Sequence, residues 1–468
     1  MSAAFLSVGG LSVAYGGTPV LRDVSFDLRP GETLAILGLS GCGKTTLLRA
    51  LLGLLPPGAR VTGTLQIGSG TVALSDRDAL RRRLGRDIGF VAQNPFDACA
   101  PLRRVRAHLE EAWRAHGLKP DPARIAALCE RLALDPAMLD RHSHEWSGGM
   151  LQRANIAAAV ALAPPVVVAD EPTSAVDAET AGSVMDCLRA GAPGTIIVSH
   201  DLDLVARSAD RVILIEAGRI AAMTTRAGMA ADRLPPALRA FRQAGAVAPP
   251  SAPKDEVVLQ TLGLSVARGE RRLIAGLDLQ LRRGEILGVA GRSGVGKSTL
   301  LAVLAGSLAP EAGAILRGGT ARPPHRGEVL SLFQDALSSM NPRWPLFCIV
   351  AEPLTVPTRK QPPEARRTAT DAALAAFGLS HVPVAARPGT LSTGQGQRAT
   401  LARASLARPV LILADEPTSA LDPRQKALAL AGLSRLAREG AAVVLVSHDR
   451  PMLDAVCHTV VDVSSGLP

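Results

Sequence analysis

Aromatic residues are scarce in this sequence of 468 residues, and none of its hydrophobic runs suggests a membrane span. Phe, Trp and Tyr make up 3% of the chain against 47% for hydrophobic residues as a class, so the apolar content is mostly Ala, Leu and Val. That composition is typical of helices packed on a buried parallel sheet. The nearest candidate for a span, residues 154–169, is short and contains Asn155 and the pair Pro164-Pro165. Since the start does not resemble a signal peptide, we expect a cytosolic protein.

Closely spaced cysteines and long basic runs are also missing. The six cysteines are scattered, without a C-x-x-C pair, which favours free thiols over disulfides or a zinc site. The net charge is +10, but the basic runs at 81–83 and 103–106 are short and lack interleaved aromatics. We therefore favour arginines on solvated faces over a nucleic-acid or lipid surface.

The sequence is organised around GLSGCGKTT, residues 38–46, which lies between an apolar run and a helix-like run. The spacing G-x-x-x-x-G-K-[ST] predicts a phosphate-binding loop, because its glycines can take positive φ and turn backbone N–H groups toward phosphate oxygens. Lys44 would reach the β- and γ-phosphates, and Thr45 would offer a hydroxyl to Mg²⁺. The alternative is a Gly-rich turn between two elements. Nucleotide contacts are expected from Gly38, Ser40, Gly41, Gly43, Lys44, Thr45 and Thr46.

A second copy of the pattern, GRSGVGKST, occupies residues 291–299, and Lys297 follows Lys44 by 253 residues. The same offset aligns Gly31-Glu32 with Gly284-Glu285. This repetition disfavours the simple turn and indicates a unit of roughly 230 residues present twice. The second set of expected nucleotide contacts is Gly291, Ser293, Gly294, Gly296, Lys297, Ser298 and Thr299.

Two carboxylates follow the apolar strand predicted at residues 166–169. Asp170 is expected to hold Mg²⁺, together with Thr45 and Gln93, and Glu171 to polarise the attacking water. Gln93 ends another short apolar strand and can sense the γ-phosphate, although alone it would mean little. His200 ends the strand predicted at 195–199 and is placed to hydrogen-bond the γ-phosphate. A lone histidine after a strand is usually structural, but here it follows the other nucleotide elements.

Ser147, Gly148 and Gly149 open a long predicted helix and form a candidate anion site. Free N–H groups, the positive end of the helix dipole and the absence of a Cβ all favour a phosphate there. The alternative is an ordinary Ser N-cap followed by glycines. Tyr15, the only tyrosine, could stack on adenine or be an ordinary strand residue.

Taken in order, these motifs resemble the nucleotide-binding domain of the ABC transporter family. The resemblance implies an α/β P-loop NTPase fold: two tandem cassettes, each with a RecA-like core, an antiparallel β subdomain and an inserted helical subdomain. We expect cassettes at 1–235 and 257–468, joined by a Pro/Ala-rich linker at 236–256. In this family each ATP is held between one cassette's phosphate loop and the other's signature segment, here residues 147–149 or 392–395.

The second half matches this set with two departures. Its metal ligands, base and histidine are expected at Ser298, Gln334, Asp415, Glu416 and His448, with Ser392, Gly394 and Gln395 in its signature segment. Arg268 stands where the first half has Tyr15, so in the second half a guanidinium plane, instead of an aromatic ring, would stack on adenine. Thr393 stands where the first half has Gly148, and a β-branched residue narrows the approach to a phosphate. The resemblance therefore predicts unequal sites, with the Lys297 and Glu416 site hydrolysing ATP faster.

Three stretches, residues 74–95, 146–153 and 333–343, resemble the importers of peptides, nickel and metal chelates. The resemblance implies an ATP- and Mg²⁺-dependent hydrolase at the cytoplasmic face of the inner (plasma) membrane. It would dock peripherally beneath two transmembrane permease subunits, which receive solute from an extracytoplasmic binding protein, with no direct nucleic-acid partner. The segments 94–101 and 335–345 would lie near the groove for the permease coupling helix.

Two other classes of protein share parts of this chemistry. A soluble twin-cassette ATPase acting on ribosomes or nucleic acid would carry the same ATP motifs, but such proteins usually have a long, charged, helical linker. A nucleotide switch without turnover is disfavoured because both Glu171 and Glu416 are present.

Overall fold

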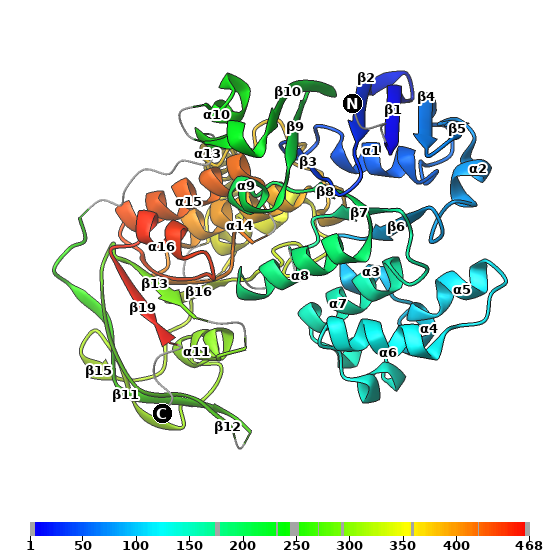
Figure 1. Ribbon diagram of the computed structural model, residues 1–468. Helices are drawn as coiled ribbons and strands as arrows, with labels where there is room; N and C mark the ends of the chain where they lie inside the picture. The colour runs from blue at the N-terminus through cyan, green and yellow to red at the C-terminus, as the bar shows by residue number, and fades with distance from the viewer. Residues whose placement is uncertain are drawn as a thin grey trace. The chain divides into compact units, whose positions relative to one another are not determined.

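The computed structural model describes residues 5–173, 178–230, 233–243, 252–269, 271–291, 294–356, 360–419 and 421–463. The chain divides into two compact units, Met1–Gln243 and Ala244–Pro468. Figure 1 colours the first from blue to green and the second from yellow-green to red. Ser293, expected to contact nucleotide, lies outside the described residues.

Within the described part of the first unit, two sheets share one core. The antiparallel sheet has the order β2-β1-β4-β5, and the larger sheet the order β10-β9-β3-β8-β7-β6, parallel except for the β9–β10 hairpin. The strands are β1 (Leu6–Tyr15), β2 (Thr18–Leu28), β3 (Thr33–Leu37), β4 (Arg60–Ile67), β5 (Gly70–Ala73), β6 (Ile88–Val91), β7 (Val166–Asp170), β8 (Gly194–Val198), β9 (Arg211–Glu216) and β10 (Arg219–Thr225).

Helices cover both faces of the larger sheet, and the central strand β3 shows why. Leu34 and Ile36 face α1 and the antiparallel sheet, whereas Ala35 and Leu37 face the opposite helical layer, as the two-residue period of a strand requires. The helices are α1 (Lys44–Leu51), α2 (Arg77–Arg81), α3 (Pro95–Ala98), α4 (Val105–Leu109), α5 (Glu111–Ala115), α6 (Pro122–Arg131), α7 (Gly148–Ala159), α8 (Ala178–Gly191), α9 (Leu202–Ser208) and α10 (Pro236–Gln243), with 3₁₀ turns η1 (Pro136–Asp140), η2 (Ser143–Glu145) and η3 (Arg226–Met229). The α3–α6 group is the helical subdomain predicted between β6 and α7.

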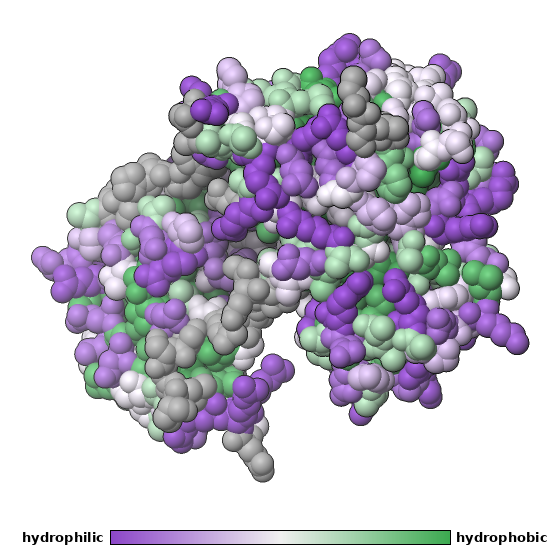
Figure 2. Space-filling model, in the orientation of Figure 1, coloured by the Kyte–Doolittle hydropathy of each residue, from purple (hydrophilic) through white to green (hydrophobic). Residues whose placement is uncertain are grey.

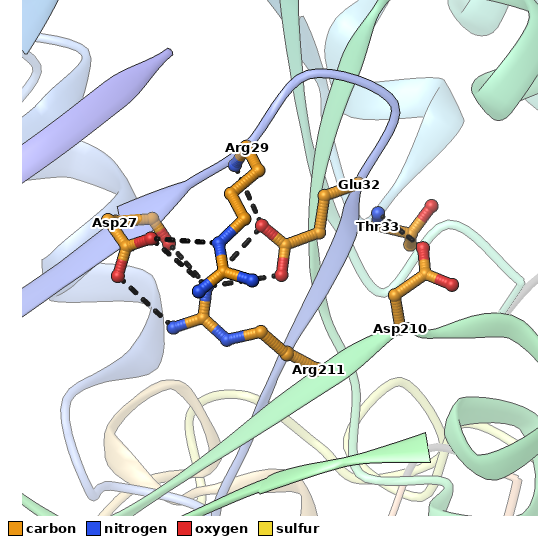
Figure 3. A network of polar contacts seen from close by, with 6 residues as sticks. All are labelled: Asp27, Arg29, Glu32, Thr33, Asp210 and Arg211. Carbon is orange, nitrogen blue, oxygen red and sulfur yellow. Dashed lines mark hydrogen bonds and ion pairs between the residues drawn. The ribbon is translucent and has the colours of Figure 1, made fainter. Parts of the chain in front are cut away.

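An ion-pair network fixes the start of β3 (Figure 3). Arg211 donates to Asp27 at 3.2 Å and to Glu32 at 3.1 Å, and the Thr33 amide donates to Asp210 at 2.9 Å. Glu32 is 8% exposed, so its charge is stabilised by the guanidinium rather than by water. The network holds β2, β3 and β9 together and thereby positions the loop at the far end of β3.

The second unit repeats this plan with fewer strands among its described residues. Its antiparallel sheet has the order β12-β11-β14-β15 and its parallel sheet the order β16-β17-β18-β13-β19. The strands are β11 (Val257–Arg268), β12 (Arg271–Arg282), β13 (Ile286–Ala290), β14 (Ala312–Arg317), β15 (Thr320–Ala321), β16 (Val329–Leu332), β17 (Leu411–Asp415), β18 (Ala442–Val446) and β19 (Thr459–Asp462). The helices are α11 (Lys297–Leu304), α12 (Leu346–Ala351), α13 (Pro363–Ala376), α14 (Thr393–Ala407), α15 (Pro423–Arg438) and α16 (Arg450–Val456), with η4 (Glu352–Leu354) and η6 (Pro388–Thr390).

The stretch predicted as a linker, 236–256, differs from that expectation at its start. Residues 236–243 form helix α10, and its Leu238 and Phe241 are buried in the core of the first unit. The remainder of the linker lies partly outside the described residues, at 244–251.

Candidate functional site

The loop between β3 and α1 has a backbone that only glycine can supply. Gly43 caps α1 at φ 107°, and a Cβ there would lie 2.7 Å from the Leu21 side chain. A Cβ on Gly38 would lie 2.7 Å from the carbonyl oxygen of Ile215. Lys44 is buried, and its Nζ donates to the carbonyls of Gly38 at 2.7 Å and Leu39 at 3.1 Å. The loop therefore curls around an ammonium group, with the N-terminus of α1 behind it, as a phosphate cradle requires.

Parallel pairing brings the end of β7 to the same sheet edge as this loop, because β8 pairs with both β3 and β7. Asp170 ends β7, is 6% exposed, and accepts a hydrogen bond from Thr45 Oγ1 at 3.4 Å. Burial, and then the charge of Glu171, raise the pKa of Asp170 to about 6. A buried carboxylate beside a hydroxyl is a hard oxygen-donor set, which suits Mg²⁺ and would be stabilised in its ionised form by it.

Glu171 follows in the left-handed region, at φ 45°, which turns its side chain toward two partners. Its Oε2 accepts from Gln93 Nε2 at 2.9 Å, and its Oε1 contacts His200 Nδ1 at 2.9 Å. Burial alone would raise the pKa of Glu171, but the hydrogen bond and charge of His200 outweigh it and lower that pKa. Burial likewise opposes the charge on His200, yet Glu171 raises its pKa overall. The carboxylate is thus ionised at neutral pH.

The second unit repeats this arrangement with one difference. Gly296 caps α11 at φ 107°, and Lys297 donates to the Gly291 carbonyl at 2.7 Å. Glu416 is again left-handed, at φ 43°, and contacts His448 at 3.2 Å, while burial raises the pKa of Asp415 against its hydrogen bond from Ser298. Here, however, Gln334 donates to Ser419 at 3.4 Å rather than to the glutamate.

Comparison with known proteins accounts for this doubled geometry. The family described as ABC transporter matches residues 21–174 and 274–419. The chain belongs to the ABC transporter family. It is accordingly an ATP-binding protein and an ABC-type ATPase built from two cassettes.

Relatives extend the similarity over nearly the whole chain. The oligopeptide transport ATP-binding protein OppD of Mycobacterium bovis is 30% identical, covering 98% of this chain and 94% of that protein. The peptidoglycan transport ATP-binding protein YejF of Agrobacterium fabrum is 32% identical, covering 98% and 91%. Among solved structures, RNase-L Inhibitor has a TM-score of 0.65 at 20% identity, covering 96% of this chain and 87% of that one, which shows the fold alone. In the part of the chain that the structure describes, no helix is both long and apolar enough to cross a bilayer.

The two signature segments begin helices, as predicted for each cassette. Ser147 caps α7 by accepting from the Met150 amide at 3.3 Å. Ser392 caps α14 in a reciprocal capping box with Gln395, which accepts from the Ser392 amide at 2.9 Å. Thr393 is exposed at the first position of α14, so its branched side chain stands where Gly148 leaves the α7 backbone bare.

The residues predicted to stack on adenine end equivalent strands. Tyr15 closes β1 and packs its half-buried ring against the core, whereas Arg268 closes β11 and is exposed. A stacking role for either residue stays a prediction.

Gln152 is a residue that the sequence analysis missed. It is fully buried in α7, and its Nε2 donates to the carbonyl of Pro172, directly after Glu171. This bond ties helix α7 to the segment that carries Glu171. Repetition in the sequence could have identified Gln152, because Gln397 follows Ser392 at the same distance of five residues. Gln397 is also buried.

The histidine–glutamate pairs predict how stability depends on pH without nucleotide. A lowered Glu171 pKa contributes stability that is complete above its ordinary value of 4.5 and is lost as the pH falls through the folded pKa. A raised His200 pKa contributes stability that is complete below pH 6.5 and is lost as the pH rises through the folded pKa.

The midpoint of thermal unfolding should therefore fall as the pH rises above 6.5. The double variant His200→Gln, His448→Gln should lose that alkaline fall, whereas His325→Gln on the surface should keep it. An unchanged profile in the double variant would refute the assignment.

Proposed function

We propose that this chain is the ATP-hydrolysing subunit of an ABC importer for peptide-type solutes, with nickel or metal chelates as the alternative cargo. The observation that carries the proposal is the duplicated set of phosphate loop, carboxylate pair and histidine, in a chain similar over 98% of its length to proteins named for oligopeptide and peptidoglycan transport. A third relative, the glutathione import ATP-binding protein GsiA of Salmonella typhimurium, is 31% identical over 97% of this chain. These names favour peptide-like cargo over nickel.

We propose the following residue roles. Thr45, Asp170 and Gln93 hold Mg²⁺ in the first cassette, and Ser298, Asp415 and Gln334 in the second; bound there, the ion would neutralise charge on the phosphate oxygens. Glu171 and Glu416 accept the proton of the attacking water, which their lowered pKa values permit at neutral pH. His200 and His448, which orient these carboxylates, hold the γ-phosphate. Lys44 and Lys297 exchange their backbone carbonyl partners for phosphate oxygens.

We further propose that each site is completed by the other cassette. Each cassette carries two candidate anion sites, a phosphate loop and a helix N-terminus, and the family resemblance implies that one nucleotide contacts one of each. Lys44, Glu171 and His200 would then face residues 392–395, and Lys297, Glu416 and His448 would face residues 147–149.

Exposed apolar side chains support the proposed docking beneath two transmembrane permease subunits. An extracytoplasmic binding protein would deliver solute to those subunits. Phe96 is 45% exposed and Leu102 91% exposed, three and nine residues after Gln93. In the second unit Phe333, just before Gln334, is 57% exposed, and Trp344, within the matching segment 335–345, is 44% exposed. Figure 2 shows hydrophobic residues at the surface over the α3–α5 group. A contiguous patch of exposed apolar side chains is typical of a surface that a partner covers, whereas single ones are common on any protein. Such docking would hold the chain at the cytoplasmic face of the inner membrane.

The double variant Phe96→Asp, Leu102→Asp tests the docking surface. Charge placed in an apolar interface should lower the fraction that sediments with membranes by about fivefold to tenfold, equivalent to ~1 kcal/mol or more. Met223→Asp, an exposed apolar position on β10, is the matched control and should sediment as the unmodified chain does. If the chain sedimented with ribosomes instead of membranes, the proposed importer function would be rejected in favour of a soluble ATPase that acts on ribosomes.

A further inference from the structure

Asn155 is a polar side chain buried in the middle of α7, with 3% of its surface exposed. Its Nδ2 donates to the carbonyl of Pro95 at 3.3 Å. Its Oδ1 accepts from His108 Nε2 at 2.8 Å and from the Cys99 thiol at 3.5 Å. A buried amide left unpaired is costly, so these partners fix both the position of Asn155 and the orientation of its amide.

These bonds connect three segments that have different roles. Pro95 begins α3 two residues after Gln93, and His108 lies on α4, beyond the exposed Leu102. Asn155 belongs to α7, whose N-cap is Ser147, about two turns away. The proposed docking segment is therefore hydrogen-bonded to the helix whose N-terminus is the proposed phosphate contact.

The second cassette lacks this connection at the matching positions. Thr400 replaces Asn155, and its hydroxyl donates to the Gln397 carbonyl of its own helix at 2.7 Å. Met340 and Ile349 replace Cys99 and His108, and both are buried among apolar side chains. Apolar contacts can slide past one another, whereas a hydrogen bond weakens steeply when its length or angle changes.

We propose that Asn155 is a positioning residue that couples the docking segment, residues 94–102, to the signature helix α7 in the first cassette alone. The inference rests on the proposed function. Movement of the Pro95 backbone, caused by a docked partner, is transmitted through Asn155 to the N-terminus of α7, and closure around nucleotide is transmitted the other way. The second cassette packs without this link, so its docking segment responds less to the state of its own signature helix.

Hydrogen exchange in the full chain tests the coupling without any permease. A nonhydrolysable ATP analogue with Mg²⁺ should slow amide exchange in the phosphate loop, at 147–151, and at 94–101. In Asn155→Thr, which installs the residue of the second cassette, the slowing at 94–101 should shrink by about tenfold while that at 147–151 persists. His108→Leu should act in the same direction, and His108→Gln, whose amide can still donate to Asn155, should restore the unmodified pattern.

The controls separate coupling from stability and from ATP binding. Thr400→Val should leave exchange at 94–101 unchanged, and thermal unfolding of each variant reports any loss of fold. Equal slowing at 94–101 in Asn155→Thr, in His108→Leu and in the unmodified chain would overturn the proposal. It would also be overturned if the unmodified chain showed slowing at the phosphate loop but none at 94–101. Absence of slowing at the phosphate loop itself would instead refute the proposed ATP site.

Discussion

Replacing Glu416 with Gln should lower steady-state ATP turnover by about a hundredfold, the scale expected when a general base is removed. Glu171→Gln should cost much less. The Glu416 site is expected to be completed by residues 147–149, where Gly148 presents bare backbone to the phosphate, whereas the Glu171 site would face the branched side chain of Thr393. The structure adds a second reason to expect the Glu416 site to be faster. Gln93 and His200 contact both carboxylate oxygens of Glu171, whereas in the second unit Gln334 donates to Ser419 instead of Glu416.

The measurement compares turnover of the two variants with ATP in excess. Glu439→Gln, an exposed carboxylate paired with Arg435 on α15, is the matched control and should turn over ATP at the unmodified rate. A larger loss from Glu171→Gln than from Glu416→Gln would reverse the assignment of the faster site.

Much of the fold could be predicted because the decisive information is local or repeated. A buried strand, a glycine-rich loop and a helix follow one another within residues 33–51, and the second copy confirms the spacing. The prediction of two ABC cassettes with parallel cores, antiparallel sheets and helical subdomains is confirmed. Asp170 lies beside Thr45, as the Mg²⁺ role predicted for both requires, because the carboxyl ends of parallel strands meet at one edge.

The parts that could not be predicted depend on contacts between distant residues. From the sequence, Asn155 serves only as an argument against a membrane span. Its contact with Pro95 could not be predicted, because Pro95 lies sixty residues away along the chain. Gln334 donates to Ser419 and not to Glu416, and residue type alone does not predict which of two nearby acceptors a glutamine contacts. Helix α10 lies in the stretch predicted as a linker because Ala and Pro surround it, although Leu238 and Phe241 are spaced to face a core.

The signature segments provide a test of whether the two cassettes complete each other's sites. Gly148→Thr should lower turnover of the otherwise unmodified chain by about tenfold, or ~1.4 kcal/mol in the barrier. In the proposed arrangement it would bring to the faster site the side chain that Thr393 would bring to the slower one. The helix should still form, since α14 begins with Thr after the same Ser N-cap. Thr393→Gly should have the opposite effect on the slower site.

The variant Glu416→Gln makes this test specific, because its residual turnover comes from the Glu171 site. Thr393→Gly added to it should raise the residual turnover by about tenfold. Gly148→Thr added to it should change nothing, since in the proposed arrangement Gly148 and Glu416 would belong to the same site. If each cassette instead used its own signature helix, Gly148→Thr would act on the Glu171 site and lower the residual turnover. Sensitivity of the residual turnover to Gly148 rather than to Thr393 would therefore refute the exchanged arrangement while leaving the chemistry of each phosphate loop intact.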